Sequence, residues 1–583
     1  MGTLRGFGRV TLLGVGLACS FAAACGDSEH PTPVGTVGES GADSGGAKNA
    51  SDAAGAGDSA GVGDSVATEG GTGAGGSAGA GDSAGAAGGE TTKTDCAPGF
   101  FVEFEHECFA CPDGSFTTET NQPSCTSWTN CPAGSYVSLP GSATSDRACA
   151  PCPSDQSTTV SNTAQCSPLV KQVSAGTSHA CALLTDGSVK CWGDNFYGEL
   201  GYGNTKNVGY SDKPSTVGVV SVTTTPGVSV TQIAAGNGET CAVLSDGSLK
   251  CWGHNNYGQL GYGNTQDIGD DELPSSVGAV SVSTTAGVTV TQVAMGPLQV
   301  CALLSNGALK CWGRNDYGQL GSANSTTIGD DELPSSVSPV NVSLGLTVTQ
   351  VAVGGFHVCA LLSDHSLKCW GRNDYGQLGQ GNFKMIGDNE QPFEVAPISV
   401  TGAAGVTIAQ VGAGTYHTCV RLSDGSLKCW GSSGYGQLGY GNTDTIGDTE
   451  VPYTVGTVSV TTVPKVTATE LVVSSMNTCA LLSDNSVRCW GSNDHLQLGF
   501  NSNNLSIGDN ELPSSIDPLS ITTLQGVTVT QLSSNFGYNC ALLSTGSVKC
   551  WGLNDRGQLG LTIQQQDCCY GVHPSDLDPV QLF

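Results

Sequence analysis

The stretch CAVLSDGSLKCWG, residues 241–253, decides the fold. Two apolar, partly alternating segments flank Asp-Gly, which is a strong signal for a β-hairpin turn. A two-residue loop would set Cys241 opposite Trp252, whereas a three-residue loop at 245–247 sets Cys241 opposite Cys251. The three-residue loop is a known type, a type I turn followed by a left-handed residue that is usually Gly. Opposed Cα atoms lie about 4.5–5.5 Å apart and disulfides span about 4.4–6.8 Å, so this register predicts a cross-strand disulfide.

Similar stretches occur seven times in the chain, at steps of 58 to 61 residues. A fixed period of this kind is the signature of a repeat architecture. The loop position expected to be left-handed holds Gly in five copies, His365 in one and Asn485 in another. Because His and Asn tolerate positive φ, we expect His365 to be a turn residue and not a catalytic one. The predicted hairpin disulfides are Cys181–Cys191, Cys241–Cys251, Cys301–Cys311, Cys359–Cys369, Cys419–Cys429, Cys479–Cys489 and Cys540–Cys550.

Each repeat also carries short Val- and Thr-rich segments separated by Gly, Asn and Pro. In one repeat these are VTVTQVAMG at 288–296, before the hairpin, and LPSSVGAVSVS at 273–283. Such segments indicate about four strands per repeat. Seven repeats of four strands predict an all-β fold that closes radially into a seven-bladed propeller. A solenoid is the alternative, but it would need polar capping repeats, which are not visible.

One repeat carries a family resemblance. GTYHTCVRLSDGSLKCWGSSGYGQLGYGN, residues 414–442, closely resembles the regulator of chromosome condensation repeat, and the resemblance extends over about 170–583. It implies a seven-bladed β-propeller, in which one blade often joins the two chain ends, here 579–583 near 169–173. The paired cysteines are not part of the family pattern. The eukaryotic member exchanges nucleotide on a small nuclear GTPase, which an exported chain cannot meet, so no small GTPase is expected as partner.

The His of the family pattern varies between repeats, which favours a structural role over a catalytic one. It is present at His179, His357 and His417, and other residues are assigned to the position elsewhere. Those other residues are Glu239, Gln299, Asn477 and Asn539.

The N-terminal region predicts export. Arg5 and Arg9 precede an apolar run at 10–24, and this order is typical of a signal peptide, here at 1–24. The run is too short for a transmembrane helix. AAAC followed by Gly-Asp resembles a bacterial lipoprotein cleavage site with Cys25 as the lipid-bearing residue, and simple cleavage with secretion is the alternative. The Gly-, Ala-, Ser- and Asp-rich remainder of 25–94 cannot bury a core and is expected to be a disordered tether.

Residues 95–168 form a cysteine-rich module with two similar units, each with Cys-x2-Cys followed by a Cys after 13 residues. The units resemble the cysteine-rich repeats of tumour-necrosis-factor-receptor and ephrin-receptor ectodomains. Zinc is a rival reading, but the exported context favours disulfides. Four cysteines per unit allow three pairings. The pairs expected are Cys96–Cys108, Cys111–Cys125, Cys131–Cys149 and Cys152–Cys166, and the pairing of Cys568 and Cys569 stays open.

Composition limits the function. The net charge of −30 argues against nucleic acid or an anionic membrane surface as partner, and the 26 cysteines indicate an oxidising compartment. Gly-x-Ser-x-Gly occurs only by composition in the Gly- and Ser-rich tether, at 57–61, 75–79 and 81–85, and we find no His-Glu-x-x-His or phosphate-binding glycine loop. No catalytic residue, cofactor or metal is therefore predicted.

Two repeated features are candidates for binding. Acidic stretches such as IGDDELP at 268–274 offer oxygen ligands that suit calcium, but no shell of about 6–8 oxygens is visible locally. The simpler alternative is a turn with a solvated carboxylate that faces Lys250 and its equivalents. The second feature is a repeated aromatic position. Its side chains are candidate binding anchors, and the simpler alternative is that they only pack beside the Gly-Gln-Leu-Gly turn. It comprises Tyr197, Tyr257, Tyr317, Tyr375 and Tyr435, with His495 and Arg556 in the last two repeats. The repeated Trp is expected between blades.

Together these features predict a non-enzymatic exported protein, anchored through its lipid or secreted, whose disulfide-stapled propeller binds an extracellular protein or glycan. The alternatives are an extracellular hydrolase-like enzyme with its site at the propeller mouth and a structural envelope protein. Convergent acids or a His pair in the channel would favour the enzyme, whereas a Tyr-rich rim without acids would favour binding.

Overall fold

The computed structural model describes residues 95–103, 107–158, 161–500, 506–562 and 573–583. The predicted signal peptide, Cys25, the tether and Cys568-Cys569 lie outside the described residues. Within the described part of the chain, no helix is long and apolar enough to cross a membrane.

The hairpin at residues 239–253 forms as expected. Strands β13 (Glu239–Leu244) and β14 (Leu249–Gly253) pair antiparallel with Cys241 opposite Cys251, and the two cysteines are bonded. The amide of Gly247 donates to the carbonyl of Leu244 at 2.9 Å, and Gly247 has φ of +78°. At the same loop position His365 and Asn485 each have φ of +66°. His365 is therefore a left-handed turn residue.

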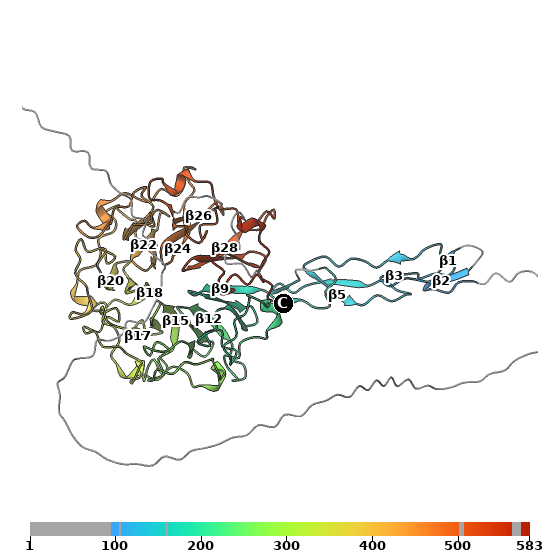
Figure 1. Cartoon of the computed structure of the whole chain (residues 1–583), viewed down its shortest axis with the longest axis horizontal. Coiled ribbons are helices and arrows are strands. Elements are labelled where there is room, and N and C mark those ends of the chain that lie inside the picture. Colours follow the sequence, from blue (N-terminus) through green and yellow to red (C-terminus); the bar gives the residue numbers. More distant parts are fainter. Residues whose placement is uncertain (1–94, 104–106, 159–160, 501–505, 563–572) are drawn as a thin grey trace, which may run out of the picture. The chain divides into compact units, whose positions relative to one another are not determined.

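Seven sheets built on these hairpins follow one another around a centre (Figure 1). In each, an inner strand precedes the hairpin, so that six of these sheets, within the described residues, have three strands and one has four. The predicted all-β propeller class is confirmed. The strands are β9 (Val170–Ala175), β10 (His179–Leu184), β11 (Val189–Gly193), β12 (Val230–Ala235), β13, β14, β15 (Val290–Met295), β16 (Gln299–Leu304), β17 (Leu309–Gly313), β18 (Val348–Val353), β19 (His357–Leu362), β20 (Leu367–Gly371), β21 (Ile408–Ala413), β22 (His417–Leu422), β23 (Leu427–Gly431), β24 (Ala468–Val473), β25 (Asn477–Leu482), β26 (Val487–Ser492), β27 (Ser506–Ile507), β28 (Val529–Asn535), β29 (Tyr538–Leu543) and β30 (Val548–Gly552).

The expectation of about four strands per repeat is wrong for most sheets. The outer segment begins with a 3-10 turn at a proline, such as Pro274–Ser276, and a single backbone hydrogen bond from Val280 to the carbonyl of Leu249 ties it to the hairpin. The lysine of the hairpin holds this turn, because Lys250 Nζ donates to the carbonyl oxygens of Pro274 and Val277. The alternative in which the acidic turns face these lysines is therefore also wrong.

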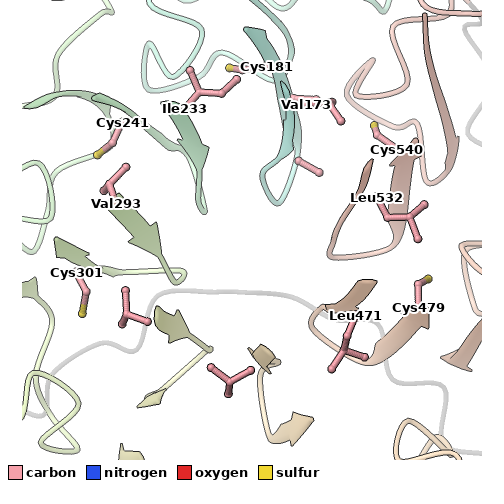
Figure 2. Packing of buried hydrophobic residues seen from close by; sticks show 14 of the residues in the cluster. Val173, Cys181, Ile233, Cys241, Val293, Cys301, Leu471, Cys479, Leu532 and Cys540 are labelled. Carbon is pink, nitrogen blue, oxygen red and sulfur yellow. The ribbon is translucent and has the colours of Figure 1, made fainter. Parts of the chain in front are cut away.

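The ring closes through side chains that link neighbouring inner strands. The amide of Ile233 donates to Gln172 Oε1 at 3.0 Å, and Val173 donates to Gln531 Oε1 at 3.0 Å, which joins the last sheet to the first. Apolar residues of successive inner strands lie side by side around the axis, next to the hairpin cysteines (Figure 2). The indole of each of the seven repeated tryptophans donates to a carbonyl of the preceding repeat, and Trp192 reaches Gln558 of the last repeat at 3.0 Å. The tryptophans are thus buried between sheets, as expected.

The expected pairing of 579–583 near 169–173 is wrong. Residues 170–175 form β9 and pair with β10 of their own sheet, whereas Val580 donates to Val548 at 2.8 Å in the last sheet. The first and last strands of the propeller therefore each belong to their own sheet. The two sheets are joined by hydrogen bonds between side chains of β28 and the backbone of β9 and by one backbone bond from Val170 to Gly546.

The cysteine-rich module consists of short two-stranded sheets. Its disulfides join Cys96–Cys108, Cys111–Cys125, Cys131–Cys149 and Cys152–Cys166. Its strands are β1 (Phe100–Glu103), β2 (Glu107–Ala110), β3 (Ser115–Phe116), β4 (Thr126–Ser127), β5 (Ser135–Leu139), β6 (Ala148–Pro151), β7 (Gln156–Ser157) and β8 (Ser167–Pro168).

Candidate functional site

A cavity of about 300 Å³ lies where the turns after the inner strands converge on the axis. Its lining includes Asn237, Gly355, Thr415, Ser475 and Phe536, and no acid, base or histidine lines it. Glycines allow the turns to meet, because a Cβ at residue 414 would lie 2.3 Å from the carbonyl oxygen of Ser474. The lining therefore combines backbone and small polar groups with apolar side chains such as Val353, Val473 and Phe536.

Beneath the cavity lies a ring of buried polar side chains, and all of them except Glu239 contact the neighbouring sheet. His179 Nε2 lies 2.8 Å from Thr240 Oγ1, and His357 and His417 make the same contact with their neighbours. Burial lowers the pKa of His179 to about 4 and the pKa values of His357 and His417 to about 3. These histidines are neutral at ordinary pH and hold sheets together.

In the last sheet the ring position is Tyr538 and not Asn539, which corrects the sequence assignment. Tyr538 lies opposite Gly552, as His179 lies opposite Gly193, and its hydroxyl donates to the carbonyl of His179. Asn539, which the sequence analysis assigned to this position, lies one residue further along the chain.

The ring position in the second sheet holds an acid. Glu239 is fully buried, and neither of its carboxylate oxygens has a hydrogen-bond partner. Burial raises its pKa well above the ordinary value, and the nearby charge of Glu199 adds to the effect. Burial likewise raises the pKa of Glu199 to about 7. At this position in the third sheet, Gln299 Nε2 donates to the carbonyl of Gly354 at 2.9 Å. A protonated Glu239 can donate in the same way, whereas a carboxylate cannot.

The predicted tyrosines stand at one repeated position, in the turn after each hairpin, and none of them lines the axial cavity. The turn that carries each tyrosine is fixed by the following Gln or Glu, since the amide of Tyr257 donates to Gln259 Oε1 at 2.8 Å. Tyr375 and Tyr435 are each 40% exposed, and the other three tyrosines are partly buried. The turn therefore carries each tyrosine on a backbone that this hydrogen bond holds in place.

The structure gathers part of the row into an aromatic–arginine cluster of Tyr317, Phe356, Arg372, Tyr375 and Tyr416. The rings of Tyr317 and Phe356 are 5.5 Å apart, and those of Tyr375 and Tyr416 are 5.0 Å apart. The Arg372 guanidinium lies 4.8 Å from the Tyr317 ring, 5.4 Å from Phe356 and 5.5 Å from Tyr416. Phe356 and Tyr416 directly follow cavity-lining residues, so the cluster borders the mouth.

Two other members of the row contact residues of the following repeat. Tyr197 stacks on His254 at 4.1 Å, and Arg314 lies 5.2 Å from the Tyr257 ring. The sequence reasoning missed Arg372, Phe356 and Tyr416, because their contacts join different repeats. The available signal was an aromatic residue directly before His357 and His417.

Calcium binding by the acidic turns remains untested. Asp270, Asp271 and Glu272 place one carboxylate oxygen each within 4.8 Å of one another, and 330–332 do the same. Glu272 Oε2 accepts a hydrogen bond from Gly269 within its own turn at 3.3 Å. Exposed acids in such turns are common without an ion.

The ring of repeated sheets with an axial mouth defines a repeat β-propeller, here with a cysteine-rich module in the same chain. An RCC1-like domain model matches residues 138–469 and 220–581, and the chain belongs to this family. A model of the TNFR/NGFR cysteine-rich region matches residues 111–149. The resemblances to the chromosome condensation regulator repeat and to the tumour-necrosis-factor-receptor repeat are thereby confirmed.

Three known proteins show the range of the similarity. The ultraviolet-B receptor UVR8 of Arabidopsis thaliana is 28% identical over 390 residues, 67% of this chain and 78% of that protein. The E3 ubiquitin-protein ligase HERC2 of Homo sapiens is 29% identical over 47% of this chain, a match that spans only 5% of HERC2. The crystal structure of human WBSCR16 has a TM-score of 0.51 at 21% identity, covering 65% of this chain and 92% of that one.

Proposed function

We propose that this chain is an exported binding protein whose propeller presents the aromatic–arginine cluster to a protein partner. The observation that carries the proposal is the position of Arg372 among three rings beside a cavity that no acid, base or histidine lines. Tyr and Arg are enriched, with Trp, among the few residues that dominate the binding energy at protein interfaces, because they combine a large contact area with directed polar contacts. The RCC1-like relatives point in the same direction, to a protein-interaction scaffold.

The rim is also preorganised. Arg372 is ion-paired with Asp374 at 2.7 Å and stacked on rings, so binding freezes few additional rotamers. A rigid anchor loses less entropy on association than a flexible one. Neither a small GTPase nor nucleic acid is proposed as the partner, since the net charge is −30 and the compartment is expected to be extracellular.

Export is part of the proposal. Eleven disulfides join described cysteines, and disulfides persist in oxidising compartments. The apolar run at 10–24 and Cys25 supply a leader and a lipid anchor at the cell envelope, with secretion as the alternative.

The role proposed is not enzymatic. An enzyme with its site at the propeller mouth would need convergent acids or a pair of histidines in the channel. The lining of the axial cavity, within the described residues, contains neither. The buried histidines are neutral and bonded to threonines beneath it. A hydrolase assay across glycan, ester and peptide substrates tests this part, and turnover that is lost with Glu239→Gln would favour the enzyme.

Affinity capture tests the binding role. The full chain, produced in an oxidising compartment, is used against extracellular and envelope fractions beside two variants. Tyr317→Ala/Tyr375→Ala removes two rings of the cluster, and Tyr453→Ala removes an exposed ring outside it. We expect a protein that is enriched by the wild type and by Tyr453→Ala but not by the double variant. Equal capture by all three would contradict the proposal, and loss on deglycosylation alone would favour a glycan.

A further inference from the structure

One repeated position sets the third sheet apart. Directly after the Leu-Gly that ends each tyrosine turn, the first, second and fifth sheets carry Tyr202, Tyr262 and Tyr440. Each of these rings fills the space beside the outer strand of its hairpin. The Tyr202 hydroxyl accepts from the amide of Cys191 and donates to its carbonyl oxygen, both at 3.1 Å. Burial raises the pKa of each of these tyrosines to about 12.

The third sheet has Ser322 at this position, and no side chain takes the place of the ring. The Ser322 hydroxyl turns to Asn324 Oδ1 and Asn315 Nδ2, both at 3.2 Å. A cavity of about 360 Å³ lies there, and its walls include Cys311, Leu320, Ile328, Val337, Ser338 and Val340.

Comparison with the other sheets shows that the cavity results from the missing ring. The cysteine of the outer hairpin strand is 0% exposed where a tyrosine covers it, at Cys191, Cys251 and Cys429, and 3% exposed where Ser322, Gln380 or Phe500 stands instead, at Cys311, Cys369 and Cys489. In the fourth sheet Gln380 reaches over the same space, and its amide donates to the carbonyl of Ala396 at 3.1 Å.

The cavity retains polar groups that serve the tyrosine hydroxyl in other sheets. Tyr262 exchanges hydrogen bonds with the amide and carbonyl of Cys251, which corresponds to Cys311. Tyr440 donates to the carbonyl of Gly456 at 3.3 Å, which corresponds to Ser338. Cys311 and Ser338 both line the cavity. Leu320, Ile328, Val337 and Val340 form an apolar part of the wall, beside polar side chains that include Glu332, Gln391 and Asn324. The amide donor and nearby carbonyl acceptors within this wall match a phenol, which is both donor and acceptor.

We propose that this third-sheet cavity is a binding site for a phenol ring with a substituent opposite its hydroxyl. The chain itself shows the fit, because its own tyrosines occupy the equivalent space in three other sheets. The ring is that of a free small phenol or of a tyrosine side chain from a partner. The volume lies in the range of small-molecule sites, about 300–1,000 Å³. The site is separate from the axial mouth and goes beyond the function proposed for it.

Isothermal titration of the full chain with 4-methylphenol tests the site. We expect saturable binding with a Kd on the order of 0.1–1 mM, as suits a ligand of eight heavy atoms. Toluene, which lacks the hydroxyl, is expected to bind at least tenfold more weakly. Ser322→Tyr fills the cavity with the chain's own ring and is expected to abolish binding and raise Tm. Thr224→Tyr adds a ring at an exposed position and is expected to bind like the wild type.

A second variant and a second probe keep the test decisive. If Ser322→Tyr fails to fold, Ser322→Gln places the fourth sheet's residue at the site and is expected to block binding in the same way. N-acetyltyrosinamide binding as tightly as 4-methylphenol would identify a tyrosine side chain as the ligand source, and binding of 4-methylphenol alone would identify a free phenol. The absence of saturable binding, equal binding of toluene, or binding that survives a folded Ser322→Tyr would overturn the proposal.

Discussion

Replacing Glu239 by Gln is predicted to stabilise the propeller increasingly as pH rises. The folded-state pKa of Glu239 is raised by burial, whereas in the unfolded chain the pKa is about 4.3. Between these two values the folded state keeps a proton that the unfolded state releases. The stability that depends on this proton is fully present below the unfolded pKa and is lost as pH rises toward the folded pKa.

The magnitude follows from one proton. The wild type loses about 1.4 kcal/mol of unfolding free energy per pH unit through Glu239, and Glu239→Gln does not. The difference between the two proteins therefore grows by up to about 1.4 kcal/mol for each pH unit between the unfolded and the folded pKa of Glu239. Burial also raises the pKa values of Glu199 and Glu470 to about 7. Both residues are present in the two proteins, so their contributions to the pH dependence of stability largely cancel in the comparison. Gln also supplies the amide donor that Gln299 uses in the third sheet.

The assay is guanidinium unfolding of both proteins at pH 5.5, 6.5 and 7.5 with the disulfides intact. The converse variant, Gln299→Glu, buries a second acid and is expected to lose stability with the opposite trend. Parallel curves for the wild type and Glu239→Gln would refute the reasoning, because they would mean that Glu239 is ionised in the folded protein.

Three further predictions concern staples, packing and anchoring. The double change Cys359→Ala/Cys369→Ala removes a disulfide with a sequence separation of 10. We expect the free energy of unfolding in urea to fall by about 2.7 kcal/mol, and an unchanged value would contradict a stabilising role for this disulfide. Tyr262→Ser copies the third-sheet cavity into the second sheet and is expected to cost about 2–4 kcal/mol by calorimetry, whereas an unchanged Tm would contradict the packing described for that ring. Cys25→Ser is expected to move the exported chain from the detergent phase to the aqueous phase, and unchanged partitioning would exclude the lipid anchor.

The parts of the fold that the sequence predicted are those encoded within one repeat. Asp246-Gly247 and the spacing of Cys241 and Cys251 determine the hairpin register, because turn type and strand register are local properties. The outer segment was misjudged, since its Val and Thr content suggests a strand while proline and a 3-10 turn limit its pairing to single hydrogen bonds. Propensity alone does not show where a neighbouring strand is available.

The site was predicted only in part for a related reason. The tyrosine row is visible as a repeated position, but Arg372 reaches Tyr317 from the preceding repeat and Tyr416 from the following one. Such contacts depend on how sheets are placed around the axis, which a single repeat does not encode. The third-sheet cavity is likewise visible only when Ser322 is compared with the tyrosines that fill equivalent space.

The measurement that tests the central claim most directly is the dissociation constant of the captured partner for Arg372→Ala against the wild type and Tyr453→Ala. Arg372 contacts three rings of the cluster, and its removal takes away both charge and packing at the rim. We predict that Arg372→Ala weakens binding by about tenfold or more while Tyr453→Ala leaves it unchanged. Equal affinities for all three proteins would place the binding surface elsewhere and contradict the account.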